Sequence, residues 1–353
     1  MKTNNRYFKW VYRLIFLVAT LMILLGFFNY VIDPMWCFDH ANKFNSYQHS
    51  IDERQQKTNY LIFNKKKYDA LVIGNSRTAQ INQNDFAGMK AFNYAVSSMS
   101  PYEYRGFIDN FTAISGSPRT ILLGLDFKNT VSGSNKSEKQ PVYYLSKSNE
   151  LFYRYKLLPT KDLYLYSLSN LKLKKAIEFK KFGHCEIVYD RSNIASLTPS
   201  NDAIYKEDFD ILVKEISTTF GHSYKYNADV IRIYKEIAEN SNSRIIAFTT
   251  PVSKPFFCAM TRERGADYER WLRDMVEIFG EVWHFEYLHS VSRDYKPNFA
   301  DAHHAYPEVG TMIAKKVTGA YNPATPSDFG MLLNKSNIDE KMIRLKSDIA
   351  ECQ

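Results

Sequence analysis

The chain has 353 residues, of which 46 are basic and 38 are acidic, and its formal net charge is +8. Four of the basic residues lie within the first 13 positions, which leaves +4 for the rest of the chain and excludes the strongly basic surface of a nucleic-acid-binding protein. A mean hydropathy of −0.38 excludes a multi-span membrane protein. The length suits one large α/β domain with an anchor.

The first predicted element is a membrane anchor. Residues 14–31, LIFLVATLMILLGFFNYV, are 18 positions without a charge, which is enough to cross the hydrocarbon core of a bilayer as a helix. A cleavable signal peptide is the alternative, but its apolar region is shorter and ends at a small-residue cleavage site, which FNYVIDPMW does not offer. We therefore expect a tail at 1–13 and an anchor at 14–32.

The charges around the apolar run predict the orientation of the anchor. The run is preceded by four basic residues and no acidic one, namely Lys2, Arg6, Lys9 and Arg13. The positive-inside rule then keeps the N-terminus in the cytoplasm and places everything after Asp33 outside. We expect a single-pass protein of the inner (cytoplasmic) membrane with a periplasmic body.

After the anchor we expect a polar connector at 33–65, an α/β domain at 66–325 and a C-terminal tail at 326–353. Strands are predicted at 70–73, 91–95, 120–127 and 244–251, because these runs are short, apolar and bounded by turn residues. Helical periodicity begins at Ser100, whose Ser-x-x-Glu resembles a capping box, and again over 227–241. Strands that alternate with helices predict a mainly parallel sheet in a three-layer α/β/α arrangement.

Residues 134–220 depart from this alternation and are predicted to be an insertion. The insertion contains the run KLKKAIEFKK at 172–181, with five lysines. One interpretation is a solvated helix face. The other is a basic surface that lies near membrane phospholipid or an anionic glycan.

The cysteines predict no metal site. Cys37, Cys185, Cys258 and Cys352 form no C-x-x-C pair and have no metal-type spacing. No cofactor is expected either. In an oxidising compartment one pair could join, and Cys185 and Cys258 are the candidates inside the body, although the sequence does not fix the connectivity.

Two segments carry residues that are suited to acyl transfer. In DALVIGNSRTAQ, 69–80, an apolar strand stops at Gly74 and a turn into a helix presents Ser76. In NFADAHHAYPEVGTMIAKKV, 298–317, Asp301 and His304 are three residues apart, just before a helix that starts near Pro307. A serine nucleophile needs a base within hydrogen-bond reach and a carboxylate that orients that base.

These residues also have ordinary structural interpretations. Ser76 and Asp301 could cap the helices that follow them, and His303 or His304 could be a surface group. It is the ordered combination that favours a site at the carboxyl edge of the sheet, where open α/β folds place their ligands. His303 adjoins His304 and is the alternative base.

The order of these segments resembles the SGNH (GDSL-like) hydrolase superfamily. GNSR at 74–77, NYAVSSMS at 93–100, GLDF at 124–127 and DAHH at 301–304 are similar to its blocks I, II, III and V, over roughly 66–320. In particular, the chain looks like the membrane-anchored SGNH-like proteins of bacterial envelopes, whose relatives include acyl-transfer proteins of exopolysaccharide and cell wall. The resemblance implies a flavodoxin-like SGNH fold.

The resemblance also implies roles for individual residues. Ser76 would be the nucleophile, His304 the base and Asp301 the acid that orients the base. The backbone N–H of Ser76 would be one oxyanion donor. Ser98 stands where block II has a glycine, and its N–H would be the second donor if a residue with a Cβ tolerates that backbone conformation.

Three further positions bear on the oxyanion site. Asp126 replaces the asparagine of block III, and an ionised carboxylate would repel the developing charge; one lost oxyanion donor typically costs about 3–4 kcal/mol. Asn75 replaces the aspartate usual before the nucleophile, and Asn93 could lend a side-chain amide. Arg77 could bind a substrate carboxylate or phosphate, or pair with Asp126.

These observations lead to one expected function and two alternatives. We expect an extracytoplasmic esterase or O-acyltransferase that acts on a cell-surface polysaccharide, with a glycan or acyl donor as its ligand and a multi-span acyltransferase as a candidate partner. The first alternative is a catalytically inactive SGNH-like module that binds a glycan or a membrane partner. The second is a single-span membrane protein without a functional cleft.

Overall fold

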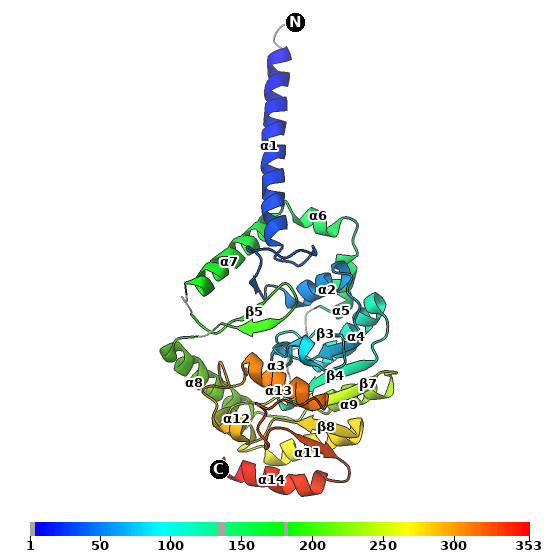
Figure 1. The fold of residues 1–353 in the computed structure, drawn as a ribbon, viewed down its shortest axis with the longest axis vertical. Coiled ribbons are helices and arrows are strands. Elements are labelled where there is room, and N and C mark those ends of the chain that lie inside the picture. Colours follow the sequence, from blue (N-terminus) through cyan, green and yellow to red (C-terminus); the bar gives the residue numbers. More distant parts are fainter. Residues whose placement is uncertain (1–3, 133–138, 180–182, 199) are drawn as a thin grey trace. The chain divides into compact units, whose positions relative to one another are not determined.

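The computed structural model describes residues 4–132, 139–179, 183–198 and 200–353 (Figure 1). The chain is a mixed α/β protein that divides into two compact units. We call the first the anchor unit; it consists of Met1–Lys65, Tyr144–Lys181 and Tyr189–Ser192. We call the second the sheet unit; it consists of Lys66–Tyr143, Phe182–Val188 and Asn193–Gln353.

The sheet unit is built on a six-stranded, mainly parallel sheet. Its strand order is β3-β2-β4-β7-β8-β9. The strands are β2 (Ala70–Ile73), β3 (Ala91–Asn93), β4 (Thr120–Leu125), β7 (Arg244–Thr249), β8 (Glu281–His284) and β9 (Met331–Asn334). The first five are parallel, and β9 runs antiparallel to β8. The parallel strands, counted along the chain, have the spatial order 2-1-3-4-5, which is a doubly wound arrangement whose switch point lies between β2 and β4.

The four strands predicted from sequence are present, and three of them end earlier than predicted. All residues of β2 and β4 are buried, as expected of parallel strands that are covered on both faces. The runs predicted at 91–95, 120–127 and 244–251 end at Asn93, Leu125 and Thr249. The residues beyond these ends turn into the loops at the carboxyl edge of the sheet.

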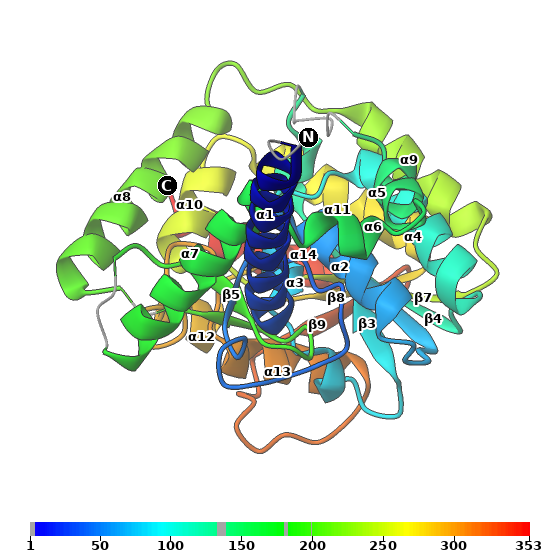
Figure 2. The ribbon, with the colours of Figure 1, turned by 90° about the horizontal axis from the view of Figure 1, so that it is seen from above.

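Helices cover both faces of this sheet (Figure 2). On one face, Val72, Leu122 and Ile246 share a core with Ile313 and Ala314 of α13 (Pro307–Val317). On the other face, α4 packs on β2, and α11 packs on β7 and β8. The helices on that face are α4 (Pro101–Ser115), α9 (Ala228–Glu239) and α11 (Gly265–Phe279). The α4 helix starts as predicted, with the Ser100 N–H donating to the Glu103 carboxylate at 3.0 Å.

The expected C-terminal tail at 326–353 belongs to the fold instead. Strand β9 pairs with β8, and α14 (Ile338–Ala350) packs against α11. This packing brings Cys352 to Cys258 on α10 (Lys254–Thr261), and the two form a disulfide. Of the two candidates named from the sequence, Cys258 is in the disulfide, while Cys185, like Cys37, is free.

The predicted insertion at 134–220 is not one separate piece, because its residues divide between the two units. Residues 133–138, 180–182 and 199, which include the last two lysines of the run at 172–181, lie outside the described residues. The described elements of this stretch are α5 (Pro141–Ser148), α6 (Tyr153–Leu157), α7 (Lys161–Glu178), β5 (Ile187–Tyr189), β6 (Ala195–Leu197) and α8 (Asp202–Thr219).

The anchor unit contains the N-terminal helix α1 (Asn4–Ile32). Its stretch Tyr7–Ile32 is long and apolar enough to cross a membrane. The helix packs on α7, and the Asn29 side chain donates to the Leu158 carbonyl at 2.8 Å. Residues 33–65, expected to be a connector, belong to this compact unit and include β1 (Gln48–His49) and α2 (Glu53–Phe63).

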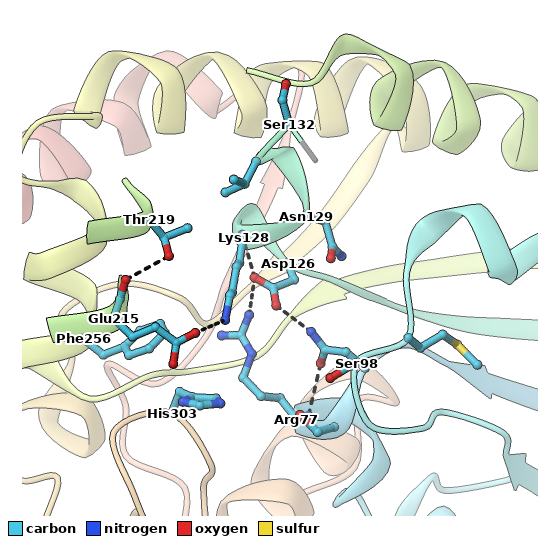
Figure 3. A pocket seen from close by; sticks show the side chains of 14 residues that line it. Arg77, Ser98, Asp126, Lys128, Asn129, Ser132, Glu215, Thr219, Phe256 and His303 are labelled. Carbon is cyan, nitrogen blue, oxygen red and sulfur yellow. Dashed lines mark hydrogen bonds and ion pairs between the residues drawn. The ribbon is translucent and has the colours of Figure 1, made fainter. Parts of the chain in front are cut away.

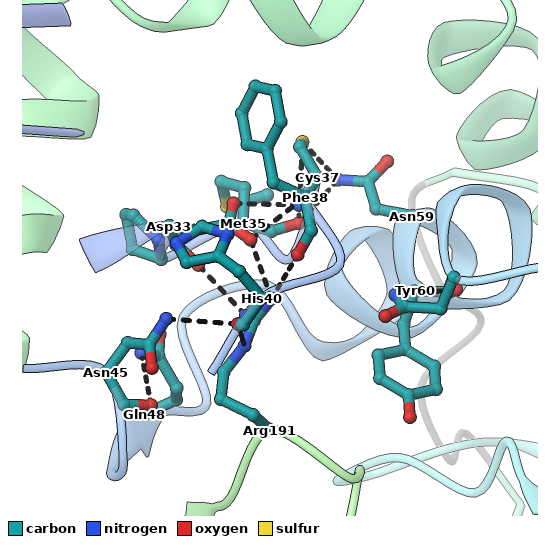
Figure 4. A network of polar contacts seen from close by, with 12 residues as sticks. Asp33, Met35, Cys37, Phe38, His40, Asn45, Gln48, Asn59, Tyr60 and Arg191 are labelled. Carbon is teal, nitrogen blue, oxygen red and sulfur yellow. Dashed lines mark hydrogen bonds and ion pairs between the residues drawn. The ribbon is translucent and has the colours of Figure 1, made fainter. Parts of the chain in front are cut away.

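A buried carboxylate, Asp33, stabilises the turn that follows α1 (Figure 4). Asp33 accepts hydrogen bonds from the backbone N–H groups of Cys37 and Phe38 at 2.8 and 3.0 Å. It also pairs with Arg191 at 2.7 Å, with both side chains buried. Because a buried charge is costly without its partner, this pair fixes the turn that follows the apolar helix.

Candidate active site

Ser76 lies at the switch point of the sheet, where β2 ends. It is the first residue of the short helix α3 (Ser76–Ala79), whose N-cap residue Asn75 accepts a hydrogen bond from the Arg77 N–H at 3.1 Å. The turn is tight because Gly74 and Gly124 both face the side chain of Thr78, with which a Cβ at either position would collide. The glycine that ends the apolar run is therefore required by packing.

The structure brings Ser76, His304 and Asp301 together. The Ser76 Oγ lies 2.9 Å from the His304 Nε2. The His304 Nδ1 lies 2.6 Å from the Asp301 Oδ2. These distances agree with the geometry expected of a nucleophile, a base and an orienting carboxylate, and His304, not His303, faces the serine.

The protons of this triplet can be assigned from its chemistry. His304 stabilises the charged form of Asp301 and holds the pKa of that carboxyl well below its usual range, against the effect of burial. An ionised carboxylate only accepts hydrogen bonds, so the Nδ1 of His304 carries the proton that it donates to Asp301. The Nε2 is then the acceptor for the Ser76 hydroxyl, which is the arrangement of a general base.

The loop between α12 (Ser290–Arg293) and α13 holds the acid and the base in place. The Asp301 Oδ1 accepts from the backbone N–H groups of His303 and His304, each at 2.8 Å. The Ala300 N–H donates to the His304 carbonyl at 2.8 Å. This local turn is why a D-x-x-H spacing can present both groups from one short segment.

His303 has a different environment from His304. Its ring lies against Phe256, with centroids 5.0 Å apart, and its Nδ1 has no hydrogen-bond partner among the residues that the structure describes. Burial lowers the pKa of His303 well below its usual value, so this imidazole is neutral at pH 7. It lines the same pocket as Ser76.

Arg77 is buried between two carboxylates. Its guanidinium reaches the Asp126 Oδ1 at 2.5 Å and the Glu286 Oε1 at 2.8 Å. Of the two roles considered from the sequence, pairing with Asp126 is the one that the structure contains. Burial raises the pKa of Glu286 to about 7, because one cation does not fully offset two buried carboxylates.

Asp126 sits between several donors. It accepts a hydrogen bond from the Asn75 side-chain amide at 2.5 Å and another from the Lys128 N–H at 2.8 Å. Burial alone would raise the pKa of Asp126, but the Arg77 guanidinium outweighs it, and the pKa is lower than usual. Asp126 is therefore charged and neutralised by Arg77.

The sequence suggests both Ser98 and Asn93 as oxyanion donors, and their environments in the structure differ. Ser98 lines the pocket with a φ of +53°, so it does adopt the left-handed backbone that favours glycine. Asn93 is buried, and its amide donates to three carbonyl groups. These belong to Thr78, Ala79 and Ile81, at 3.1, 3.2 and 2.9 Å. Asn93 therefore stabilises the loop after α3, and its amide is not free for an oxyanion.

The serine opens into a pocket of about 460 Å³, which we call the serine pocket (Figure 3). Figure 3 shows Phe256, His303 and Glu215 on one side of it and Ser98 on the other. The Lys128 ammonium lies 3.8 Å from the Glu215 carboxylate, and both side chains are partly exposed. The pocket is thus polar and carries both signs of charge.

The segment that carries His303 and His304 also contains residues that could bind a metal ion. Asp301, His303 and His304 each offer one ligand atom, and these atoms lie within 4.8 Å of one another. However, the two ring nitrogens of His304 already contact Asp301 and Ser76. We assign the cluster to the hydrogen-bonded triplet, in which a metal would have to displace one of these contacts.

Sequence reasoning missed Glu286, Lys128, Glu215 and Phe256. Glu286 comes two residues after the end of β8, in HFEYLH, and a signal for it did exist: polar residues that follow parallel strands gather at one edge of the sheet. Glu215 and Phe256 lie on helices α8 and α10 and carry no local signature. Their place in the pocket depends on tertiary packing.

Two comparisons with known proteins find no match for this chain. No protein-family model matches it, and no curated protein sequence does.

The buried Glu286 gives a pH-dependent prediction. Its folded-state pKa of about 7 lies above the usual 4.5, so its contribution to stability is lost as the pH rises from about 4.5 to about 7. We expect the free energy of unfolding of the wild type to fall relative to that of Glu286→Gln between pH 5 and pH 8, by up to about 3 kcal/mol.

Thermal unfolding of both full chains in detergent across this pH range measures the difference. Asp109→Asn is the control, because Asp109 is exposed in its pair with Arg105, and its difference from wild type should stay flat over the same range. A difference between wild type and Glu286→Gln that does not change with pH would contradict the account.

Proposed function

We propose that this chain is a membrane-anchored, SGNH-like serine esterase or O-acyltransferase that acts on a cell-surface polysaccharide. The observation that carries the proposal is the contact series from the Ser76 Oγ to the His304 Nε2 at 2.9 Å, and from the His304 Nδ1 to Asp301 at 2.6 Å. Its position at the switch point of a doubly wound sheet, which is where such folds bind ligands, adds support.

The chemistry follows from these contacts. His304 takes the proton from the Ser76 hydroxyl as the oxygen attacks the carbonyl carbon of an ester, and Asp301 stabilises the imidazolium that forms. His304 then returns the proton to the leaving alcohol, and the acyl group stays on Ser76. In the second half, His304 takes a proton from water or a sugar hydroxyl, whose oxygen attacks the acyl carbonyl carbon. The acyl group then leaves Ser76, and His304 returns the proton to the Ser76 oxygen.

The oxyanion of each tetrahedral intermediate needs hydrogen-bond donors. We assign this role to the backbone N–H groups of Ser76 and Ser98, and the left-handed backbone of Ser98 supports the assignment. The pairing of Asp126 with Arg77 reduces the repulsion that a free carboxylate would exert at this place.

We also propose that the sheet unit is periplasmic and that α1 holds it to the inner membrane. The apolar stretch of α1, the basic residues before it and the disulfide between Cys258 and Cys352 support this topology. An acyl group made in the cytoplasm would have to cross the membrane to reach Ser76. A multi-span acyltransferase is therefore the partner that we propose for the transfer reaction.

One observation favours a second candidate function. The Asp126 carboxylate lies in the serine pocket and is held in its charged form. A charged carboxylate near the reacting carbonyl opposes catalysis, whereas it is well suited to bind hydroxyl groups. The second candidate is an inactive SGNH-like module that binds a glycan or a membrane partner.

The nucleophile assignment predicts the outcome of active-site labelling. A fluorophosphonate probe should label the full chain in detergent, and Ser76→Ala should abolish the label, because the probe reacts with a serine that a base has activated. Ser132→Ala is the matched control: it removes another hydroxyl from the same pocket and should leave the labelling intact. Equal labelling of Ser76→Ala and wild type would refute the nucleophile, and no labelling of the wild type would favour the binding module.

The topology predicts where the C-terminus lies. A reporter enzyme that is active only in the periplasm, fused after Gln353, should be active, and one that is active only in the cytoplasm should be silent. Replacing Lys2, Arg6, Lys9 and Arg13 together by glutamine should weaken this asymmetry, since these charges set the orientation. The opposite reporter pattern in the unmodified chain would contradict the proposed location and remove the glycan from reach.

A further inference from the structure

The sheet unit has a second pocket, of about 770 Å³, that the proposed acyl-transfer chemistry does not use. We call it the aromatic pocket. Its wall contains four aromatic side chains, namely Tyr205, Phe209, Tyr295 and Tyr306. Its rim carries two lysines and two aspartates, namely Lys206, Lys296, Asp202 and Asp210.

Three of the rings are in contact around Phe209. Phe209 stacks on Tyr295, with ring centroids 4.9 Å apart and an interplanar angle of 25°. Tyr205 also contacts Phe209, with ring centroids 5.8 Å apart. Phe209 is buried, while Tyr205 and Tyr295 remain partly exposed. The three rings therefore offer apolar surface at the wall of the pocket.

The aromatic pocket adjoins the serine pocket. Helix α8 supplies one wall of both, with Phe209 in the aromatic pocket and Glu215 in the serine pocket. On α10, the consecutive residues Pro255 and Phe256 line the aromatic and the serine pocket respectively. Tyr306 follows the base His304 by two residues. Phe209 and Glu215 are less than two turns apart on α8, which is about 9 Å along the helix axis.

We propose that the aromatic pocket is a carbohydrate-binding subsite, which holds a polysaccharide chain while one of its sugar units reaches Ser76. This inference rests on the proposed function. Sugar rings present C–H groups on their faces and hydroxyl groups at their edges, and they match a wall of aromatic rings with a rim of charged side chains. The balance of two lysines and two aspartates fits a neutral or weakly charged glycan.

A long acyl chain is the other occupant to consider. It would match the rings but would gain nothing from the two lysines and two aspartates that line the pocket. The mixed character of the wall therefore favours the glycan, and the acyl chain becomes an outcome of the test.

The test measures binding without catalysis. The full chain carrying Ser76→Ala, in detergent, is titrated calorimetrically with oligosaccharides released from the surface polysaccharide of the source cells. Adding Tyr295→Ala should weaken the affinity about tenfold, since it removes one exposed stacking face. Tyr295→Phe should restore it, which separates loss of the ring from loss of the hydroxyl, and the labelling described below reports whether Tyr295→Ala is still folded. Tyr321→Ala, which removes a tyrosine that is 87% exposed in the same unit, is the matched control and should bind normally.

A second arm separates this proposal from the proposed function. In the chain with Ser76 intact, Tyr295→Ala should leave fluorophosphonate labelling unchanged, because Tyr295 lies outside the serine pocket. Unchanged glycan affinity in Tyr295→Ala, or no glycan binding by Ser76→Ala, would overturn the subsite while labelling of Ser76 still stood. Binding of a palmitoyl ester that Tyr295→Ala abolishes, without any effect on the glycan, would reassign the pocket to the acyl chain.

Discussion

The structure of the site depends on one buried cation. Arg77 follows the serine at the end of β2, Asp126 follows β4, and Glu286 follows β8, so the guanidinium ties together the loops that leave three strands. Breaking one side of such a buried pair typically costs about 3–5 kcal/mol, because a charge is then left without a partner. The loop that presents Ser76 is therefore held by the ion pairs of Arg77 as well as by the packing of Thr78 against two glycines.

This arrangement sets the electrostatics of the proposed chemistry. A carboxylate at position 126 would oppose the negative charge of a tetrahedral intermediate, but its charge is directed into Arg77 and the Asn75 amide. The same logic applies at the base, where Asp301 keeps its charge through His304 and two backbone N–H groups. Each carboxylate close to the serine thus has a defined partner, and the serine pocket remains polar without a large excess of one charge.

Much of this could be predicted from sequence where the signal is local. The strand at 70–73, the glycine turn before Ser76 and the D-x-x-H loop are each encoded within a few residues, and the order of these segments placed Ser76 and His304 at one sheet edge. What failed depends on contacts between distant segments. The expected tail at 326–353 is β9 and α14, and no short pattern signals that it pairs with β8 or brings Cys352 to Cys258. Asn93 has the right residue type for an oxyanion donor, yet its amide is used by three nearby carbonyl groups.

The central claim is that His304 activates Ser76 for acyl transfer, and trapping the acyl-enzyme tests it most directly. The full chain in detergent is mixed with p-nitrophenyl acetate, quenched in acid within seconds and digested with trypsin. Cleavage after Lys67 and Arg77 gives the peptide 68–77, in which Ser76 is the one serine. We predict an acetyl group on Ser76 of this peptide in the wild type and a loss of at least about a hundredfold in its rate of formation in His304→Gln. Acetylation of Ser76 at the same rate in both proteins, or its absence in the wild type, would contradict the account.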